Sequence, residues 1–161
     1  MKTGTDASDT GRESPDVVVT GTANDFLQKI VSGKHQLEAD EPGDVGGDDA
    51  GPSPYEYLLA ALGSCTSMTI GWYARKKKVP LETIQVSLWQ SRIHAKDCED
   101  CLTEDGMIDR IEMEIALTGP ITAPQQAMLM EAAARCPVHR TLTSEIDIKL
   151  RATGSPPSPP P

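Results

Sequence analysis

The sequence feature that most restricts the fold is an uncharged run of 18 residues from Tyr57 to Ala74. This length is at the lower limit for a membrane span. Against a span, the run begins beside Glu56 and contains two glycines and four serine or threonine residues, Ser64, Thr66, Ser67 and Thr69. We therefore predict a long central helix that is buried on all sides.

Signals at both ends support this helix. Pro52 and Pro54 suit its start, since proline is favoured in the first turn. The basic run Arg75–Lys78 complements the negative C-terminal end of the helix dipole, and Pro80 stops the helix.

The remaining patterns predict strands and a second helix. Thr122 and Gln125 form the signature of a capping box for a helix that ends near Arg135. β-branched or alternating apolar residues predict strands over 17–20, 26–31, 35–40, 81–93, 107–117 and 144–152. Residues 32–34 predict a turn, after which the strand over 35–40 returns as the partner of the strand before it. The order of these elements predicts an α+β fold with largely antiparallel sheets around the central helix.

Composition sets the predicted domain limits and excludes some partners. We expect a flexible segment over 1–15, one folded domain over 16–152 and a disordered proline-rich tail over 153–161. The formal charge of −9 argues against nucleic acid and anionic membranes as partners. The first residues lack the apolar stretch of a signal peptide, which favours the cytoplasm and thiol or metal chemistry for the four cysteines.

Cys65 lies in the middle of the predicted central helix. Helical spacing places it on a stripe of apolar residues: Leu58, Ala61, Leu62, Met68 and Trp72. From this position alone, Cys65 is a buried cysteine acting as a small hydrophobe.

Cys136 precedes Pro137, which favours a short helical turn over 137–142 with Cys136 as its N-cap. Exposed N–H groups and the positive end of the helix dipole lower a thiol pKa at such a position. Arg135 and Arg140 are further positive groups, and His139 is either a partner of the thiol or a structural histidine.

Cys98 and Cys101 form a C-x-x-C sequence, with His94 four residues before it. Three interpretations stay open: part of a zinc site, a redox dithiol, or two unremarkable loop cysteines. The neighbouring carboxylates raise thiol pKa values and argue against a highly reactive thiolate.

Two separated segments resemble the cysteine motifs of the OsmC/Ohr family. Residues 51–66 resemble the first motif and residues 135–142 the second, within an overall resemblance over about 20–151. The loop residues Asp40–Pro42 and Gly46–Gly47 also fit. The segment from Arg92 to Cys101 resembles an OsmC-related branch that also occurs fused to α/β-hydrolases, some of whose members carry selenocysteine in the C-x-x-C position.

The resemblance implies an intertwined α+β homodimer with its sites at the subunit interface. It implies that Cys65 attacks a hydroperoxide and becomes a sulfenic acid, which Cys136 resolves to a disulfide. Thiols or dihydrolipoyl groups would reduce that disulfide, and Cys98 with Cys101 would be an auxiliary redox dithiol. No cofactor and no metal are expected.

The sequence departs from the family pattern at two supporting positions. Organic-hydroperoxide members hold the thiolate with an Arg from the N-terminal strands, whereas this chain offers Lys29 there as a candidate. Those members also carry a Glu ten residues before the first cysteine. Here Tyr55 occupies that position, and Glu56 lies half a turn out of phase, opposite Cys65.

Two other functions remain as alternatives. The chain could be a binding module that holds a thiol or acyl ligand in an apolar cleft beside Cys65. It could also be a metal-binding protein that uses His94, Cys98 and Cys101.

Overall fold

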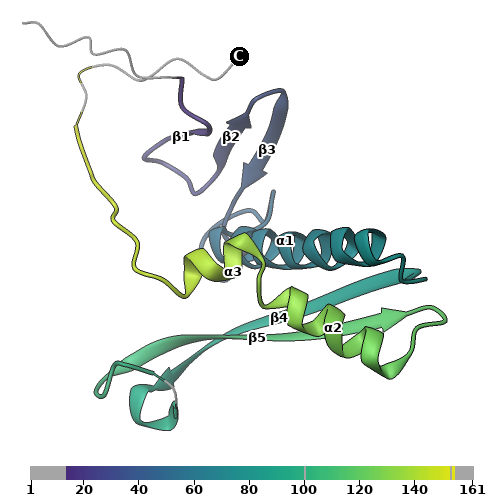
Figure 1. Ribbon diagram of the computed structural model, residues 1–161. Helices are drawn as coiled ribbons and strands as arrows, with labels where there is room; N and C mark the ends of the chain where they lie inside the picture. Colours follow the sequence, from purple (N-terminus) through teal and green to yellow (C-terminus); the bar gives the residue numbers. More distant parts are fainter. Residues whose placement is uncertain (1–13, 100, 153, 155–161) are drawn as a thin grey trace, which may run out of the picture. The chain divides into compact units, whose positions relative to one another are not determined.

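A computed structural model describes residues 14–99, 101–152 and 154 (Figure 1). They fall into two compact units, one ending at Pro54 and resuming at Lys149, the other spanning Tyr55–Ile148. The expected flexible segment over 1–15 and tail over 153–161 lie outside the described residues, apart from positions 14, 15 and 154.

The first unit contains a three-stranded antiparallel sheet. Its strands are β1 (Val18–Gly21), β2 (Gln28–Ser32) and β3 (His35–Ala39), in that order across the sheet. The predicted turn after β2 is present, and Gly33 takes a positive φ of 53° there, which glycine adopts without steric cost. Ser32 pairs with His35 across this turn, so the predicted hairpin is confirmed.

The loop after β3 is organised around Asp40, a buried side chain. Its carboxylate accepts hydrogen bonds from the amides of Glu41, Asp48 and Ala50 at 2.9, 3.0 and 3.2 Å. Gly47 is required here, since a Cβ at this position would overlap the carbonyl of Glu41. The hydrogen bond from the Ala50 amide, together with those from the Asp48 and Glu41 amides, lowers the pKa of Asp40.

The second unit consists of a long hairpin and three helices. The hairpin pairs β4 (Thr83–His94) with β5 (Met107–Thr118), and the helices are α1 (Pro54–Lys77), α2 (Ala123–Ala133) and α3 (Pro137–Leu142). Both capping-box hydrogen bonds between Thr122 and Gln125 are present at the start of α2. The predicted second helix is therefore confirmed.

The core of this unit lies where α1 and α2 cover one face of the hairpin. Ile70 of α1 and Leu129 of α2 are fully buried within it. Alternate residues of both strands pack against this cluster, among them Ile84, Ile115 and Leu117. The period-two pattern of the strands thus predicted their inward face correctly.

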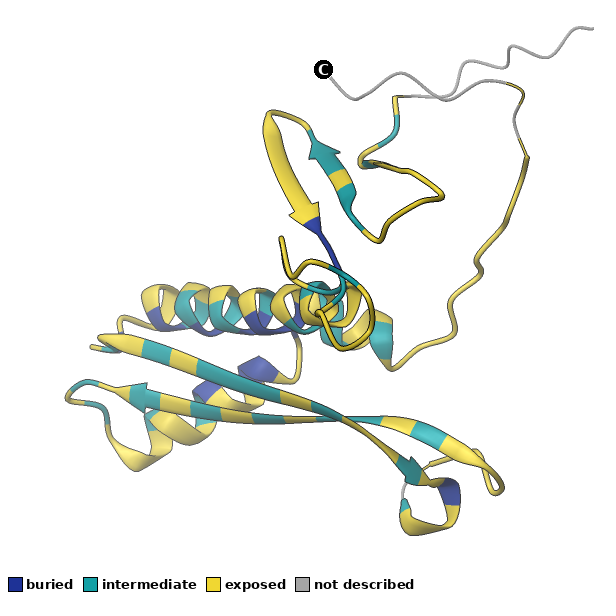
Figure 2. Cartoon of the chain, turned by 180° about the vertical axis from the view of Figure 1, so that it is seen from behind, coloured by how far each residue is buried: buried dark blue, intermediate teal, exposed yellow. Residues whose placement is uncertain are grey.

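The prediction that α1 is buried on all sides is wrong for the chain described here. The buried residues form one stripe, Leu62, Gly63, Thr66, Ile70 and Ala74, and Figure 2 shows the exposed positions on the rest of the helix. Met68 is 71% exposed and Trp72 49%, so the stripe predicted to contain Cys65 is largely the outer one. The helix is apolar on several faces, so its periodicity could not identify the face that packs.

The predicted last strand over 144–152 is also wrong, because these residues form no strand in the described structure. Ile146, Ile148 and Leu150 alternate as a strand would but are exposed, Leu150 by 94%. Alternation specifies which residues share a face, whereas a strand also requires an edge with which to pair.

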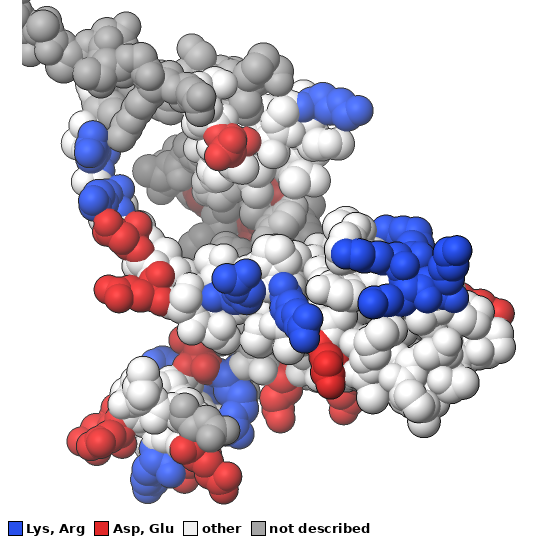
Figure 3. Space-filling view, viewed as in Figure 1, with Lys and Arg blue, Asp and Glu red and all other residues white. Residues whose placement is uncertain are grey.

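Basic side chains gather over the C-terminal end of α1, as Figure 3 shows. The last turn of α1 carries Arg75, Lys76 and Lys77, which fits the predicted interaction with the helix dipole. Lys76 also lies 4.7 Å from the centre of the Trp72 ring. None of the described helices combines the length and hydropathy that a membrane span requires.

Candidate functional site

The structure brings Cys65 of α1 and Cys136 of α3 together. Their side chains share a hydrogen bond, although 71 positions separate them in the sequence. Cys65 is half-buried and Cys136 fully buried. The spacing of the sequence alone did not establish this contact.

Cys136 is positioned by the break between α2 and α3. Its amide donates to the carbonyl of Ala133, and Pro137 begins α3, so Cys136 is the N-cap as predicted. Its side chain forms no capping hydrogen bond of normal geometry. The backbone amides of His139 and Val138 nevertheless act electrostatically on the sulfur. His139 therefore contributes through its backbone amide, rather than through the side chain that the sequence suggested as a partner of the thiol.

The two thiols have opposite pKa shifts. Burial raises the pKa of Cys65, and the hydrogen bond with Cys136 raises it further. Burial also acts to raise the pKa of Cys136, but the Cys65 thiol, the His139 and Val138 amides and the Thr66 hydroxyl outweigh it and lower the pKa. Cys136 is therefore the more acidic thiol of the pair.

Thr66 is a site residue that the sequence reasoning missed. Its side chain is fully buried, and its hydroxyl has no hydrogen-bond partner of normal geometry among the described residues. The signal in the sequence was a hydroxyl residue directly after Cys65, in a stretch predicted to be buried.

A groove of about 360 Å³ runs between α1 and β4. Ser64, next to Cys65, contributes to its wall, and most of the other lining residues are apolar: Leu59, Ala60, Gly63, Ile84, Val86 and Leu88, with Ser67. Gly63 keeps the helix close to the strand, since a Cβ there would lie 2.8 Å from Cδ1 of Leu88. The groove can therefore accept an apolar group on the cysteine-bearing helix.

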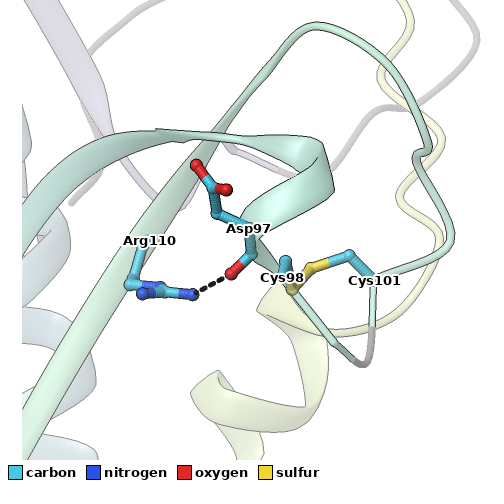
Figure 4. Close-up of a disulfide and its surroundings, with 4 residues drawn as sticks. All are labelled: Asp97, Cys98, Cys101 and Arg110. Atoms are coloured by element: carbon cyan, nitrogen blue, oxygen red, sulfur yellow. Dashed lines mark hydrogen bonds between the residues drawn. A yellow bond between two sulfur atoms is a disulfide. The ribbon is translucent and has the colours of Figure 1, made fainter.

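Cys98 and Cys101 are joined in a disulfide in the connection between β4 and β5 (Figure 4). A short 3₁₀ helix, η1 (Ala95–Asp97), precedes it, and the Arg110 guanidinium donates to the Asp97 carbonyl at 3.4 Å. Cys98 is half-buried and Cys101 exposed. No group of three or more metal-ligating residues is found in the described part of the chain.

The supporting candidates have different positions. Tyr55 and Glu56 lie in the first turn of α1, both exposed. Lys29 belongs to β2 in the first unit, and His94 ends β4. The roles of Tyr55, Glu56 and Lys29 at the cysteine pair stay predictions, as does metal binding by His94.

The chain was compared with known proteins. A sequence profile described as OsmC-like protein matches residues 46–151. No curated protein sequence matches.

Three solved structures with the same fold are 18–19% identical to this chain. A Psychrobacter arcticus protein assigned to the osmotic stress and detoxification response is 18% identical, with a TM-score of 0.64 over 82% of this chain and 90% of that one. An OsmC-like protein from Mycoplasma pneumoniae is 19% identical, with a TM-score of 0.61 over 81% and 87%. An organic hydroperoxide resistance protein from Legionella pneumophila is also 19% identical, with a TM-score of 0.58 over 83% and 91%. At these identities the likeness establishes the fold.

Proposed function

Because this chain belongs to the OsmC-like protein family, we propose that it reduces organic hydroperoxides with thiols and serves in the defence against oxidative stress. The observation that carries this proposal is the pairing of Cys65 with Cys136, one thiol half-buried and the other fully buried. A peroxide can reach the first sulfur, and the second is in place to resolve the product.

The opposite pKa shifts suggest how the first step proceeds. Cys65 passes its proton to Cys136 along their hydrogen bond, and the Cys65 thiolate attacks the hydroperoxide oxygen. The O–O bond breaks, Cys65 becomes a sulfenic acid, and the alkoxide that leaves takes the proton back from Cys136 to form the alcohol. Cys136 is then a thiolate again.

The second step forms a disulfide. The Cys136 thiolate attacks the Cys65 sulfur, the S–S bond forms, and the S–O bond breaks. The hydroxide that leaves is protonated to water. Two electrons have then passed from the thiols to the peroxide, and an external thiol or dihydrolipoyl reductant restores both cysteines.

We propose an auxiliary redox role for the exposed Cys98–Cys101 disulfide. An external thiolate can attack it, since its sulfurs lie in an exposed connection between strands. The proposal predicts that the double variant Cys98→Ser/Cys101→Ser keeps the single-turnover reaction at Cys65. The same variant should slow turnover with a thiol reductant.

We also propose that the chain acts as a homodimer. Met68 and Trp72 of α1 and Trp89 of β4 are between 49% and 71% exposed. Large exposed apolar side chains on one unit are typical of an interaction surface.

Peroxide consumption by the reduced protein tests the main proposal. Cumene hydroperoxide and hydrogen peroxide are compared in separate reactions, and disulfides are mapped afterwards by mass spectrometry. We expect faster consumption of cumene hydroperoxide and a Cys65–Cys136 bond, with neither in the variant Cys65→Ser. The double variant Cys98→Ser/Cys101→Ser is the matched control for loss of thiols outside the pair.

A second function is favoured by two observations, the apolar groove beside Ser64 and the raised pKa of Cys65. Under this alternative the protein binds an acyl or thiol ligand and the cysteines only line the site. Free Cys65 and Cys136 after peroxide treatment, together with a ligand that copurifies and binds in the groove, would support it over the peroxidase.

A further inference from the structure

We propose that Thr66 is a positioning residue for the resolving step, and that its hydroxyl stabilises the Cys136 thiolate while that thiolate attacks the Cys65 sulfenic acid. This inference rests on the proposed peroxidase function. It assigns a role to a side chain that touches neither the peroxide nor the Cys65 sulfur in the mechanism above.

In the part of the chain that the structure describes, the Thr66 hydroxyl lacks the hydrogen bond that is usual for a threonine inside a helix. Serine and threonine inside helices commonly donate to a carbonyl three or four residues earlier. The neighbouring Thr69 does so, donating to the carbonyl of Cys65 at 2.8 Å, and Ser64 donates to the carbonyl of Ala61 at 3.2 Å. Thr66 makes no such bond although it is fully buried, so its proton is available to another acceptor.

Cys136 is buried and lies within reach of the Thr66 hydroxyl's electrostatic effect. Its sulfur is also fully buried, and the Thr66 hydroxyl lies among the groups that lower its pKa. A buried thiolate without water needs donors from the protein. Of the groups that act on this sulfur to lower its pKa, the His139 and Val138 amides belong to α3 and the Thr66 hydroxyl to α1.

The two chemical steps of the proposed reaction need different thiolates. Cys65 must be the thiolate when the peroxide is attacked, and Cys136 must be the thiolate when the sulfenic acid is resolved. A donor dedicated to Cys136 therefore assists only the second step. Removing it leaves the peroxide step no slower, because a less acidic Cys136 accepts the Cys65 proton more readily.

The variant Thr66→Val separates this role from a structural one. It replaces the hydroxyl by a methyl group of similar volume, and the hydroxyl makes no hydrogen bond to the backbone of α1 that would be lost. We therefore expect Thr66→Val to unfold at the same or a higher urea concentration than the wild type. Thr66→Ser keeps the hydroxyl and is the matched control.

Single-turnover experiments with cumene hydroperoxide give the kinetic readout. Rapid quenching and mass spectrometry follow the Cys65 sulfenic acid and the Cys65–Cys136 disulfide separately. In Thr66→Val we expect the sulfenic acid to form at the wild-type rate or faster and the disulfide to form about tenfold more slowly, as loss of one hydrogen bond to a charged group implies. Thr66→Ser should restore the rate.

Carbon NMR of labelled Cys136 gives a readout that does not depend on peroxide chemistry. The pH at which the Cys136 methylene carbon titrates should rise in Thr66→Val and return in Thr66→Ser. Resolution at the wild-type rate in Thr66→Val, or equally slow resolution in Thr66→Ser, would overturn the inference. If the wild type forms no sulfenic acid, the proposed peroxidase fails, whereas an NMR shift that persists shows that the Thr66–Cys136 contact itself is real.

Discussion

Oxidation of Cys65 and Cys136 to a disulfide should make the protein markedly more stable. The bond would close a loop of about 70 residues, since 71 positions separate the two cysteines. The chain-entropy relation for a loop of this length gives a stabilisation of about 4 kcal/mol relative to the reduced form. For a chain of this size that free energy corresponds to a rise in Tm of roughly 10 °C.

This prediction assumes that the two sulfurs can bond without distorting α1 or α3. Their existing hydrogen bond supports that assumption, because it already brings the side chains into contact. Any strain that the bond introduces would subtract from the predicted value.

The assay compares urea unfolding of oxidised and reduced protein in the Cys98→Ser/Cys101→Ser background. That background matters, since the short loop between Cys98 and Cys101 could itself contribute about 2 kcal/mol when its disulfide is intact. The variant Cys65→Ser serves as the control and should show no difference between oxidising and reducing conditions. A gain below about 1 kcal/mol, with the Cys65–Cys136 bond present by mass spectrometry, would refute the reasoning.

Three further perturbations have expected outcomes. Leu129→Ala removes a fully buried side chain from the core between α1 and α2 and should cost about 2–5 kcal/mol in urea unfolding, whereas a loss under 1 kcal/mol would mean that the core is not packed as described. Cys136→Ala should lower the pKa of Cys65, because burial still raises this pKa but the two contributions of Cys136 are gone. The rate of Cys65 alkylation against pH measures the change. An unchanged pH profile would contradict the coupling of the two thiols. Asp40 has a lowered pKa in the folded state, so its contribution to stability is present above the ordinary aspartate pKa and is lost as pH falls through the folded value. Asp40→Asn should therefore flatten the acid limb of stability against pH, and an unchanged acid limb would exclude this role.

Local chemistry in the sequence predicted much of the fold. The capping box at Thr122 and the hairpin turn at Gly33 are confirmed because each depends on residues close together in the chain. The alternating strands β4 and β5 are confirmed for the same reason, since one buried face fixes a period of two.

The errors arose where distant parts of the chain decide the outcome. The packed face of α1 is the side that meets α2 and the hairpin. Because α1 is apolar on several faces, its sequence shows no helical period that identifies this side. The strand expected over 144–152 is absent for a similar reason, since pairing requires an edge elsewhere.

The proline after Cys136 predicted that this residue is an N-cap and that its thiol pKa is lowered, and both are confirmed. The pairing of Cys65 with Cys136 came from the resemblance, and the raised pKa of Cys65 was not predicted. The order of the two pKa values depends on Thr66 and on amides of α3 that converge only in the folded chain. Thr66 was passed over because a threonine inside a helix usually satisfies its own hydroxyl on the backbone.

The six-residue length of α3 has a consequence for how the redox state of the cysteine pair can be followed. A helix this short does not persist alone in water, so its order depends on its attachments. Cys136, the N-cap of α3, interacts with Cys65 of α1, and the proposed disulfide would make this attachment covalent. The start of α3 would then stay attached to α1 in both redox states but lose the thiolate charge on oxidation, so amide exchange in α3 would report the redox state of the pair.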